Sequence, residues 1–312
     1  MRVMFWGTPE FAAPALRALV GEGFDVCAVV TRPDKPVGRD RVMTEPPVKT
    51  IALRESLPVF QPSSPKEEDF FELIEVVAPD VSVVVAYGHI LPRAIIDLPR
   101  LGTLNIHASL LPALRGAAPI QAAIRDGLTE TGVTIMRMEP ALDSGPIVLQ
   151  SRTPIADDET YGELQGRLSE LGALALIEAL TLIGLSQAGE RPQDHSLATY
   201  ARKVDRDTTR INWSRSASEV ANAISAYDPR PGAWTIFRGA DLKLFGARRL
   251  FEISGAPGEV LDAGPDGLTV ACGSGAVRIC DVQPSGKRRM EAIDWHRGRG
   301  IAIGDRLGTD FT

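Results

Sequence analysis

The stretch "TLNIHASLLP", residues 103–112, places an amide side chain and an imidazole two positions apart, at Asn105 and His107. In a β-strand, alternate side chains point to opposite faces, so these two would project together while Leu104 and Ile106 point the other way. An amide and an imidazole can both donate to a developing oxyanion, and an imidazole also exchanges protons near neutral pH. The pair therefore predicts chemistry at a carbonyl carbon.

A carboxylate follows in "EPALDSGPIVLQ", at Asp143. Taken alone, this residue is typical of a turn into the strand "PIVLQ", because Asp and Gly favour such turns. Together with the pair above, it could orient the imidazole and hold a water that accepts a proton. Asn105, His107 and Asp143 suit the transfer of an acyl group from one nitrogen to another, with no covalent enzyme nucleophile.

Two alternatives use the same residues. Ser109, His107 and Asp143 could form a hydrolytic triad, but Ser109 stands in "HASLLP" and not in the G-x-S-x-G turn that presents such a nucleophile. A polar pair on one strand face can also be a structural hydrogen bond. Chemistry is favoured only if the strand delivers the pair to a ligand-binding edge.

The first 150 residues alternate between strand and helix patterns, which predicts a doubly wound α/β domain with a Rossmann-like, mostly parallel sheet. The run "VSVVVA" at 81–86 is nearly all apolar, as in a strand covered on both faces. Such sheets bind ligands at the carboxyl ends of their strands, where residues 105 and 107 would lie. The first turn, "WGTPEF", has one glycine and does not predict a dinucleotide site. The expected strands are 2–7, 25–31, 58–62, 81–88 and 103–107, with helices at 9–23, 48–56 and 67–79.

Beyond residue 150 a strand and a long helix lead into a polar connector, followed by a helix at 216–227 and short strands with glycine turns. Short strands at near-regular spacing predict a small antiparallel, OB-like barrel. We therefore expect a catalytic domain at 1–190, a linker at 191–206 and a C-terminal domain at 207–312.

The composition excludes several classes of protein. No run reaches the roughly 18 apolar residues of a membrane helix, and the N-terminus does not resemble a signal peptide. Three scattered cysteines argue against disulfides and for the cytoplasm, and four histidines without metal-ligand spacing predict no metal. The net charge is −6, but residues 1–209 carry 20 Lys and Arg against 28 Asp and Glu, whereas residues 210–312 carry 14 against 12. This asymmetry permits a nucleic-acid partner at the C-terminal part without requiring one.

The segment "NIHASLLPALRGAAPIQAAI", followed by "ALDSGPI", resembles the formyltransferases that use 10-formyltetrahydrofolate. The resemblance implies that Asn105, His107 and Asp143 are the catalytic set of that family. It also implies folate contacts at "SLLP" and at the segment around "AYGHILP". The implied contact residues are Ser109, Leu110, Leu111, Pro112, Tyr87 and Gly88.

Within this family, the chain is most similar to the branch that acts on methionyl-tRNA. The segments that carry this resemblance, in order, are "GTPEFA", "TRPDKPVGR", "PPVK", "VVVAYGHILP", "GAAPIQ", "ETGVTIM" and "GKRRM". The resemblance implies transfer of the formyl group to the α-amine of methionine on initiator methionyl-tRNA, by a cytoplasmic enzyme that binds tRNA with its C-terminal barrel. We expect a monomer that needs no membrane and no metal.

The loop 31–47 resembles the loop with which this branch engages the tRNA acceptor end, and Arg39 matches the arginine used there. Lys35 and Arg41 add cations, and Arg can pair with phosphates or stack on bases. The alternative is a solvated loop. A second basic set could contact the RNA backbone, or be a solvated charge run: Lys243, Arg248, Arg249, Lys287, Arg288 and Arg289.

The sequence departs from the family at three positions. Ala113 and Leu114 replace a basic and an aromatic residue before "RGAAP", and His89 replaces an apolar one. Three rival functions share the remaining features: a sugar-amine formyltransferase, a hydrolase that releases formate from the same folate, and a non-catalytic RNA-binding protein.

Overall fold

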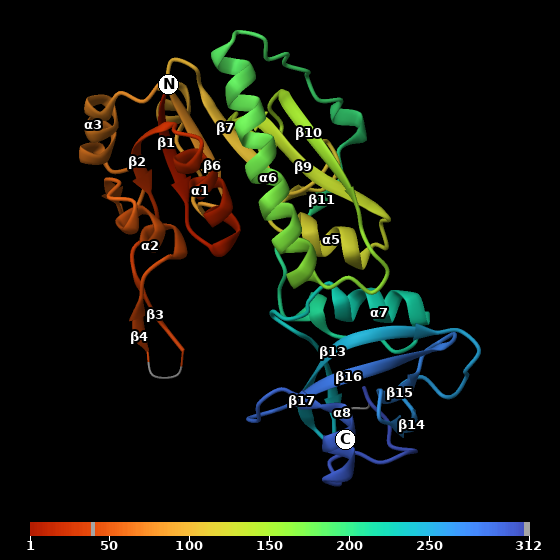
Figure 1. Cartoon of the computed structure of the whole chain (residues 1–312). Coiled ribbons are helices and arrows are strands. Elements are labelled where there is room, and N and C mark those ends of the chain that lie inside the picture. Colours follow the sequence, from red (N-terminus) through yellow and green to blue (C-terminus); the bar gives the residue numbers. More distant parts are fainter. Residues whose placement is uncertain (39–40, 309–312) are drawn as a thin grey trace. The chain divides into compact units, whose positions relative to one another are not determined.

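The computed structural model describes residues 1–38 and 41–308, which fold into two compact units (Figure 1). The first unit comprises residues 1–116, 132–153 and 165–200, and the second comprises 117–131, 154–164 and 201–312. The continuous division expected from the sequence, at the 191–206 linker, stays a prediction. Among the described residues, no helix combines the length and the apolar character needed to cross a membrane.

A seven-stranded sheet of order β10-β9-β7-β6-β1-β2-β5 forms the first unit. Strands β1, β2, β5, β6 and β7 run parallel, and β9 runs antiparallel to β7. The mostly parallel order confirms the predicted Rossmann-like α/β class. The strand bounds are Arg2–Gly7 (β1), Asp25–Val30 (β2), Val59–Phe60 (β5), Val81–Val85 (β6), Thr103–His107 (β7), Glu130–Arg137 (β9) and Ile147–Pro154 (β10).

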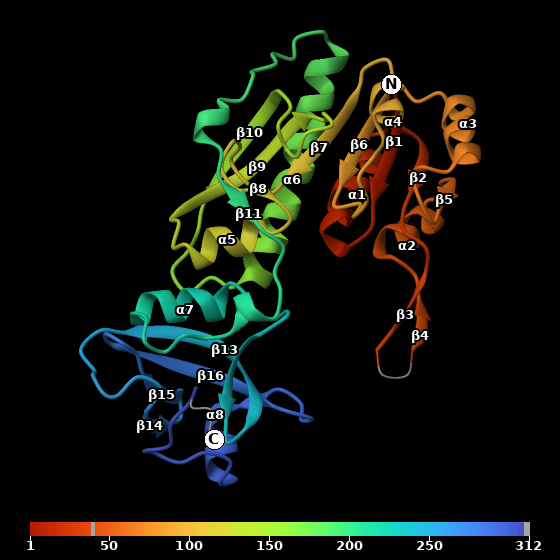
Figure 2. The ribbon, with the colours of Figure 1, turned by 180° about the vertical axis from the view of Figure 1, so that it is seen from behind.

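Helices cover both faces of this sheet. On one face Met4 and Trp6 of β1 pack with Ile74 and Ile95 from the helices α3 and α4. Helix α1 is seen in front of the sheet in Figure 1, and α4 comes into view from behind in Figure 2. All five residues of β6 are buried, as its apolar run predicted. The helix bounds are Ala13–Gly21 (α1), Pro47–Arg54 (α2), Glu68–Val77 (α3), Arg93–Asp97 (α4) and Tyr161–Gly184 (α6), with 3-10 turns at Glu10–Ala12 (η1) and His195–Leu197 (η2).

Two segments differ from the sequence-based expectation. The predicted loop 31–47 contains an antiparallel pair, β3 at Lys35–Val37 and β4 at Val42–Thr44. Its short strands include Pro36, and a proline inside so short a run is not typical of a strand. The helix expected directly after Pro112 begins only at Pro119, because Arg115–Gly116 (β8) forms a short strand first. That strand depends on backbone partners far along the chain, which no local pattern reveals.

The second unit carries an antiparallel sheet of order β12-β13-β16-β15-β14, with β17 on β16. Strands β13, β16 and β17 are labelled in Figure 1. Its helix α5 packs with α7. The antiparallel sheet is consistent with the expected OB-like barrel, whose closure stays a prediction. The bounds are Pro119–Arg125 (α5), Tyr200–Ala201 (β11), Asp207–Thr209 (η3), Ala217–Ser225 (α7), Ala233–Phe237 (β12), Ala240–Leu250 (β13), Val260–Gly264 (β14), Gly267–Ala271 (β15), Ala276–Pro284 (β16), Met290–Glu291 (β17) and Ala292–Arg297 (α8).

Candidate active site

Strand β7 carries Asn105 and His107 to the carboxyl end of the parallel strands. Asn105 lies opposite Val84 of β6, and His107 lies opposite Thr134 of β9. Because side chains alternate along the strand, both project from one face, while Leu104 is fully buried on the other. The pair therefore lies at the edge where open α/β sheets bind ligands.

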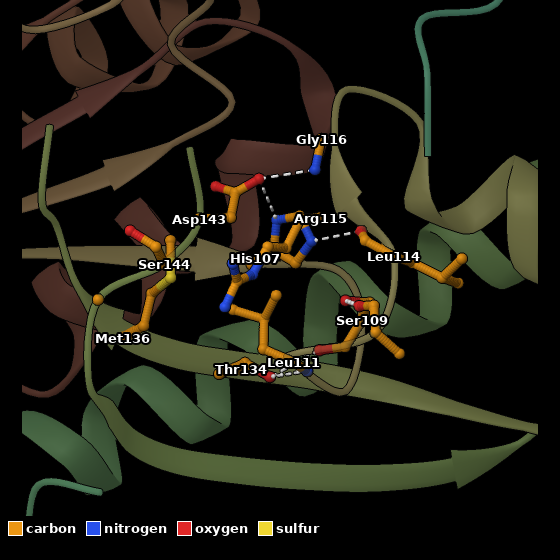
Figure 3. A network of polar contacts seen from close by, with 12 residues as sticks. His107, Ser109, Leu111, Leu114, Arg115, Gly116, Thr134, Met136, Asp143 and Ser144 are labelled. Atoms are coloured by element: carbon orange, nitrogen blue, oxygen red, sulfur yellow. Dashed lines mark hydrogen bonds and ion pairs between the residues drawn. The ribbon is translucent and has the colours of Figure 1, made fainter. Parts of the chain in front are cut away.

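The structure brings Asp143 to His107. Nδ1 of the imidazole is 3.6 Å from Oδ2 of the carboxylate, and both side chains are largely buried (Figure 3). The amide of Gly116 donates to the same Oδ2 at 2.8 Å. The separation of 3.6 Å is longer than a hydrogen bond, as is common between catalytic groups before substrate binds. The carboxylate is thus held beside the ring by a neighbouring backbone donor.

The other ring nitrogen is also occupied. Nε2 of His107 lies 3.0 Å from the carbonyl oxygen of Leu114, which can only accept, so Nε2 carries a proton in this contact. Both ring nitrogens therefore face acceptor oxygens, and an imidazolium can donate from both. The contact uses the backbone of Leu114, so the departure of that side chain from the family pattern leaves it intact.

Asn105 completes the set. Among the described residues its amide has no hydrogen-bond partner, and the side chain is half-buried. Its two N–H donors are available to an oxygen on a substrate. Asn105 can therefore donate to a substrate from this face of β7, and His107 can donate from Nε2 when a substrate oxygen replaces the carbonyl of Leu114 as its acceptor.

The loop that presents Asp143 has an unusual backbone. Asp143 adopts a φ of 47°, in the left-handed region that Asp tolerates better than most residues. At Gly145 an added Cβ would lie 2.0 Å from the carbonyl oxygen of Arg137, so only glycine fits there. Residues held in sparsely populated conformations often belong to functional sites. The short turn "DSG" thus sets the place of the carboxylate.

The predicted folate segment 109–112 is tied to β9. Thr134 donates from Oγ1 to the carbonyl of Ser109 at 2.6 Å and accepts from the amide of Leu111 at 3.1 Å (Figure 3). Ser109 and Leu111 are buried, and Leu110 and Pro112 are half-buried. The hydroxyl of Ser109 donates to the carbonyl of Ala113 at 2.6 Å. No hydrogen bond joins Ser109 to His107 within the described ranges, which speaks against the hydrolytic triad.

The other predicted folate positions lie after β6. The Tyr87 side chain is 1% exposed and packs against Trp6 in the core, where burial raises the pKa of its hydroxyl to about 12. A contact with a ligand at Tyr87 would therefore come from its backbone. Gly88 has a φ of 86°, and a Cβ there would contact the guanidinium of Arg32. Next in the chain, burial and the charges of Arg32 and Lys35 lower the pKa of His89.

The predicted tRNA-binding residues lie in or beside the β3–β4 pair. Lys35 and Arg41 are exposed and have no ion pair with any described residue, whereas Arg39 lies outside the described residues. The base of the pair is anchored by Asp34, which accepts from Lys49 at 2.7 Å and from Gln61 at 2.8 Å. These contacts, that from Gln61 first, lower the pKa of Asp34.

The six C-terminal cations fall into two groups. Arg289 bridges Asp228 and Asp281, and Arg249 pairs with Asp157 at 2.9 Å. Lys243 donates to the carbonyl of Pro231. The other three are exposed and have no ion pair within the described part of the chain: Arg248, Lys287 and Arg288.

Sequence reasoning missed one buried polar contact. The guanidinium of Arg115 lies 2.6 Å from Oε1 of Gln193, and Nε2 of Gln193 donates to the carbonyl of Asp143 at 2.9 Å. In the sequence, Arg115 is visible only as part of "RGAAP", and Gln193 only as part of a polar connector. Nothing local marks them, because 78 residues separate the two. Across residues 1–38 and 41–308, no cluster of His, Cys, Asp and Glu could hold a metal ion.

Comparison with known proteins identifies the class to which this fold and site belong. The formyl transferase family matches residues 1–180, and the formyl transferase C-terminal domain matches residues 203–300. The chain belongs to the formyl transferase family.

Its relatives narrow the class further. The chain is 47% identical to a methionyl-tRNA formyltransferase of Methylococcus capsulatus, over 99% of this chain and 100% of the relative. It is 45% identical to a methionyl-tRNA formyltransferase of Moorella thermoacetica, over 99% of each.

Two solved structures share the fold at low identity. HypX from Aquifex aeolicus in complex with tetrahydrofolic acid matches with a TM-score of 0.66 and 18% identity, over 98% of this chain and 48% of that one. WlaRD, a sugar 3N-formyl transferase, matches with a TM-score of 0.67 and 18% identity, over 92% and 99% of the two chains. These likenesses concern the fold alone.

Proposed function

We infer that this protein transfers the formyl group of 10-formyltetrahydrofolate to the α-amine of methionine on initiator methionyl-tRNA. The products are N-formylmethionyl-tRNA and tetrahydrofolate. The observation that carries this inference is the identity of about 45% to methionyl-tRNA formyltransferases over essentially the whole chain. We propose that the enzyme acts in the cytoplasm, where initiator tRNA is used in translation. We also propose that it acts as a monomer without a metal.

The reaction is a transfer between two nitrogens. The methionine amine attacks the formyl carbon, a carbon–nitrogen bond forms, and the formyl oxygen takes up negative charge. Asn105 donates to that oxygen, and His107 donates to it from Nε2 in exchange for its contact with the carbonyl of Leu114. Each such donor lowers the barrier by about 3 kcal/mol. Collapse of the intermediate breaks the bond to N10 of the folate, which leaves with a proton.

The attacking amine must also lose a proton. Asp143 lies 3.6 Å from His107 and keeps the ring oriented toward the face that it shares with Asn105. Its carboxylate can hold a water that accepts the amine proton. No residue in this scheme forms a covalent bond with the formyl group, in keeping with a serine hydroxyl that donates to a backbone carbonyl.

The two substrates have different contacts. We propose that the folate lies along Ser109–Pro112, with the backbone at Tyr87 and Gly88 beside its flat ring. We propose that Lys35, Arg39 and Arg41 engage the acceptor end of the tRNA, and that the unpaired C-terminal cations contact its phosphates. Lys35 and Arg41 support this role because they are exposed and carry no carboxylate partner among the described residues.

A formyl-transfer assay separates this function from its rivals. The purified protein is given 10-formyltetrahydrofolate with charged initiator tRNA, with an amino sugar nucleotide, or with water alone as acceptor. We expect formylmethionyl-tRNA in the first reaction and neither formylated sugar nor free formate in the others. Formylated sugar would show that the protein is a sugar-amine formyltransferase, and free formate would show that it is a hydrolase. Binding of tRNA without any turnover would indicate a non-catalytic RNA-binding protein.

A further inference from the structure

A buried cation lies next to the catalytic loop. Arg115 is 4% exposed, and none of the described carboxylates is within ion-pair distance of it. Its acceptors are Oε1 of Gln193, at 2.6 Å from Nη2 and 3.2 Å from Nε, and Nδ1 of His195 at 3.1 Å. Burying a charge costs free energy unless hydrogen bonds satisfy it, so the guanidinium of Arg115 needs both acceptors at these positions.

Gln193 also reaches in the opposite direction. Its Nε2 donates to the carbonyl of Asp143 at 2.9 Å and to the carbonyl of Gly145 at 2.8 Å. A guanidinium can only donate and a carbonyl can only accept, so a single orientation of the amide satisfies all partners. Both amide N–H groups and the amide oxygen are then used. A glutamine amide therefore supplies both the acceptor and the two donors that its neighbours require.

The backbone around Gln193 is fixed as well. Arg191 and Ile147 exchange two backbone hydrogen bonds, of 2.8 and 2.9 Å, two residues before it. Further on, Thr199 accepts from the amide of Leu114 at Oγ1, at 2.8 Å. Leu114 is the residue whose carbonyl faces Nε2 of His107. The segment 191–199 therefore touches the partners of both ring nitrogens of His107.

We propose that Gln193 is a positioning residue for formyl transfer, which fixes the carboxylate of Asp143 beside His107 by holding the carbonyls of Asp143 and Gly145. Arg115 orients the amide of Gln193 for this task. The proposal rests on the formyl-transfer function proposed above. It makes part of the polar connector after α6 a component of the catalytic unit.

The substitution Gln193→Glu separates the two halves of the contact. A carboxylate keeps the acceptor for Arg115, but it sets an oxygen against the two loop carbonyls, which it cannot bond. We expect kcat to fall between about 10- and 100-fold, as misplacement of a catalytic group by an ångström does, with both KM values changed less than about threefold. Gln187→Glu, at an exposed glutamine of the same unit, is the charge-matched control and should retain wild-type kcat.

A double-mutant cycle with Asp143→Asn distinguishes positioning from a general loss of structure. If Gln193 acts through the Asp143 carboxylate, Gln193→Glu should change kcat less than about threefold once that carboxylate is absent. Multiplicative losses in the double variant would overturn the proposal, as would a wild-type kcat in folded Gln193→Glu. Melting temperatures of all variants show whether they are folded.

A crystallographic comparison tests the same proposal without activity. In Gln193→Met, which is uncharged, we expect the Asp143 Oδ2 to His107 Nδ1 distance to exceed that of the wild type, and an unchanged distance would overturn the positioning role. A wild type that formylates no tRNA would overturn the proposed function instead, and the structures would still decide the role of Gln193.

Discussion

At the scale of residues, backbone groups hold the catalytic side chains of the site in place. His107 is held between a carboxylate at 3.6 Å and a backbone carbonyl at 3.0 Å, and the carboxylate is itself held by a backbone amide at 2.8 Å. Such backbone partners keep their geometry when neighbouring side chains vary. Ala113 and Leu114 can therefore depart from the family pattern without disturbing the contact to the imidazole.

His89 gives a prediction on pH. Burial and the nearby cations Arg32 and Lys35 lower the pKa of His89 in the folded chain below that of an unfolded histidine. As pH falls below about 6.5, the unfolded chain takes up a proton that the folded chain resists, and stability is lost. We expect His89→Leu to lose less free energy of unfolding than the wild type between pH 7.5 and 5.5.

Urea unfolding of both proteins at the two pH values measures this difference. The other histidines are present in both proteins and contribute equally. The comparison is therefore made between the changes in free energy of unfolding from pH 7.5 to pH 5.5. An equal or larger loss in His89→Leu would show that protonation of His89 does not oppose folding.

At the scale of elements, we propose that the β3–β4 pair separates the binding of the two substrates. It is anchored through Asp34, Lys49 and Gln61, and it carries exposed cations together with the exposed apolar side chains of Val37 and Met43. A pair of strands fixed at its base and exposed beyond it suits a large substrate that arrives from solvent. The proposed folate positions, by contrast, follow the carboxyl ends of β6 and β7.

Arg39 tests this separation. We expect Arg39→Ala to lower kcat/KM for charged tRNA by about tenfold or more, because a phosphate or base contact of an arginine contributes about 1–3 kcal/mol. The dissociation constant for the folate should stay within about twofold, since this element carries none of the folate positions. Steady-state kinetics and fluorescence titration with the folate give the two values. A weakened folate affinity with unchanged tRNA kinetics would move this element to the other substrate.

The same scale shows what a sequence can and cannot predict. Strands β1 and β6 and helix α7 could be predicted from local patterns, because apolar runs and apolar periodicity act over a few positions. The two-residue spacing of Asn105 and His107 likewise predicted that both side chains lie on one face of the strand. The β3–β4 pair, the strand β8 and the contacts of Gln193 could not be predicted. Each depends on partners that no local sequence pattern identifies. Gln193 lies 50 residues from the carbonyl that it holds.

At the scale of the whole molecule, a chain with a net charge of −6 carries a C-terminal basic run at Lys287, Arg288 and Arg289. Arg289 is committed to Asp228 and Asp281 and packs over the ring of Phe245 at 4.2 Å. Lys287 and Arg288 stand next to it in sequence, exposed and unpaired among the described residues. We therefore propose different tasks for adjacent cations of one basic run.

These tasks predict different phenotypes. Lys287→Ala and Arg288→Ala should weaken tRNA binding and reduce the dependence of log Kd on log salt by up to about one unit each, with an unchanged melting temperature. Arg289→Ala should instead lower the melting temperature, because it leaves the buried Asp228 carboxylate without its cation. Filter binding at several salt concentrations and thermal unfolding measure both effects. A wild-type salt dependence in the first two variants would exclude them from the RNA contact.

The most direct test of the account is the single-turnover rate of formyl transfer to charged initiator tRNA by Asn105→Ala and His107→Ala. Each variant removes one donor to the developing oxyanion, so we expect a folded protein whose rate is lower by about 100-fold or more. A rate close to that of the wild type in a folded variant would contradict the central role of these two side chains.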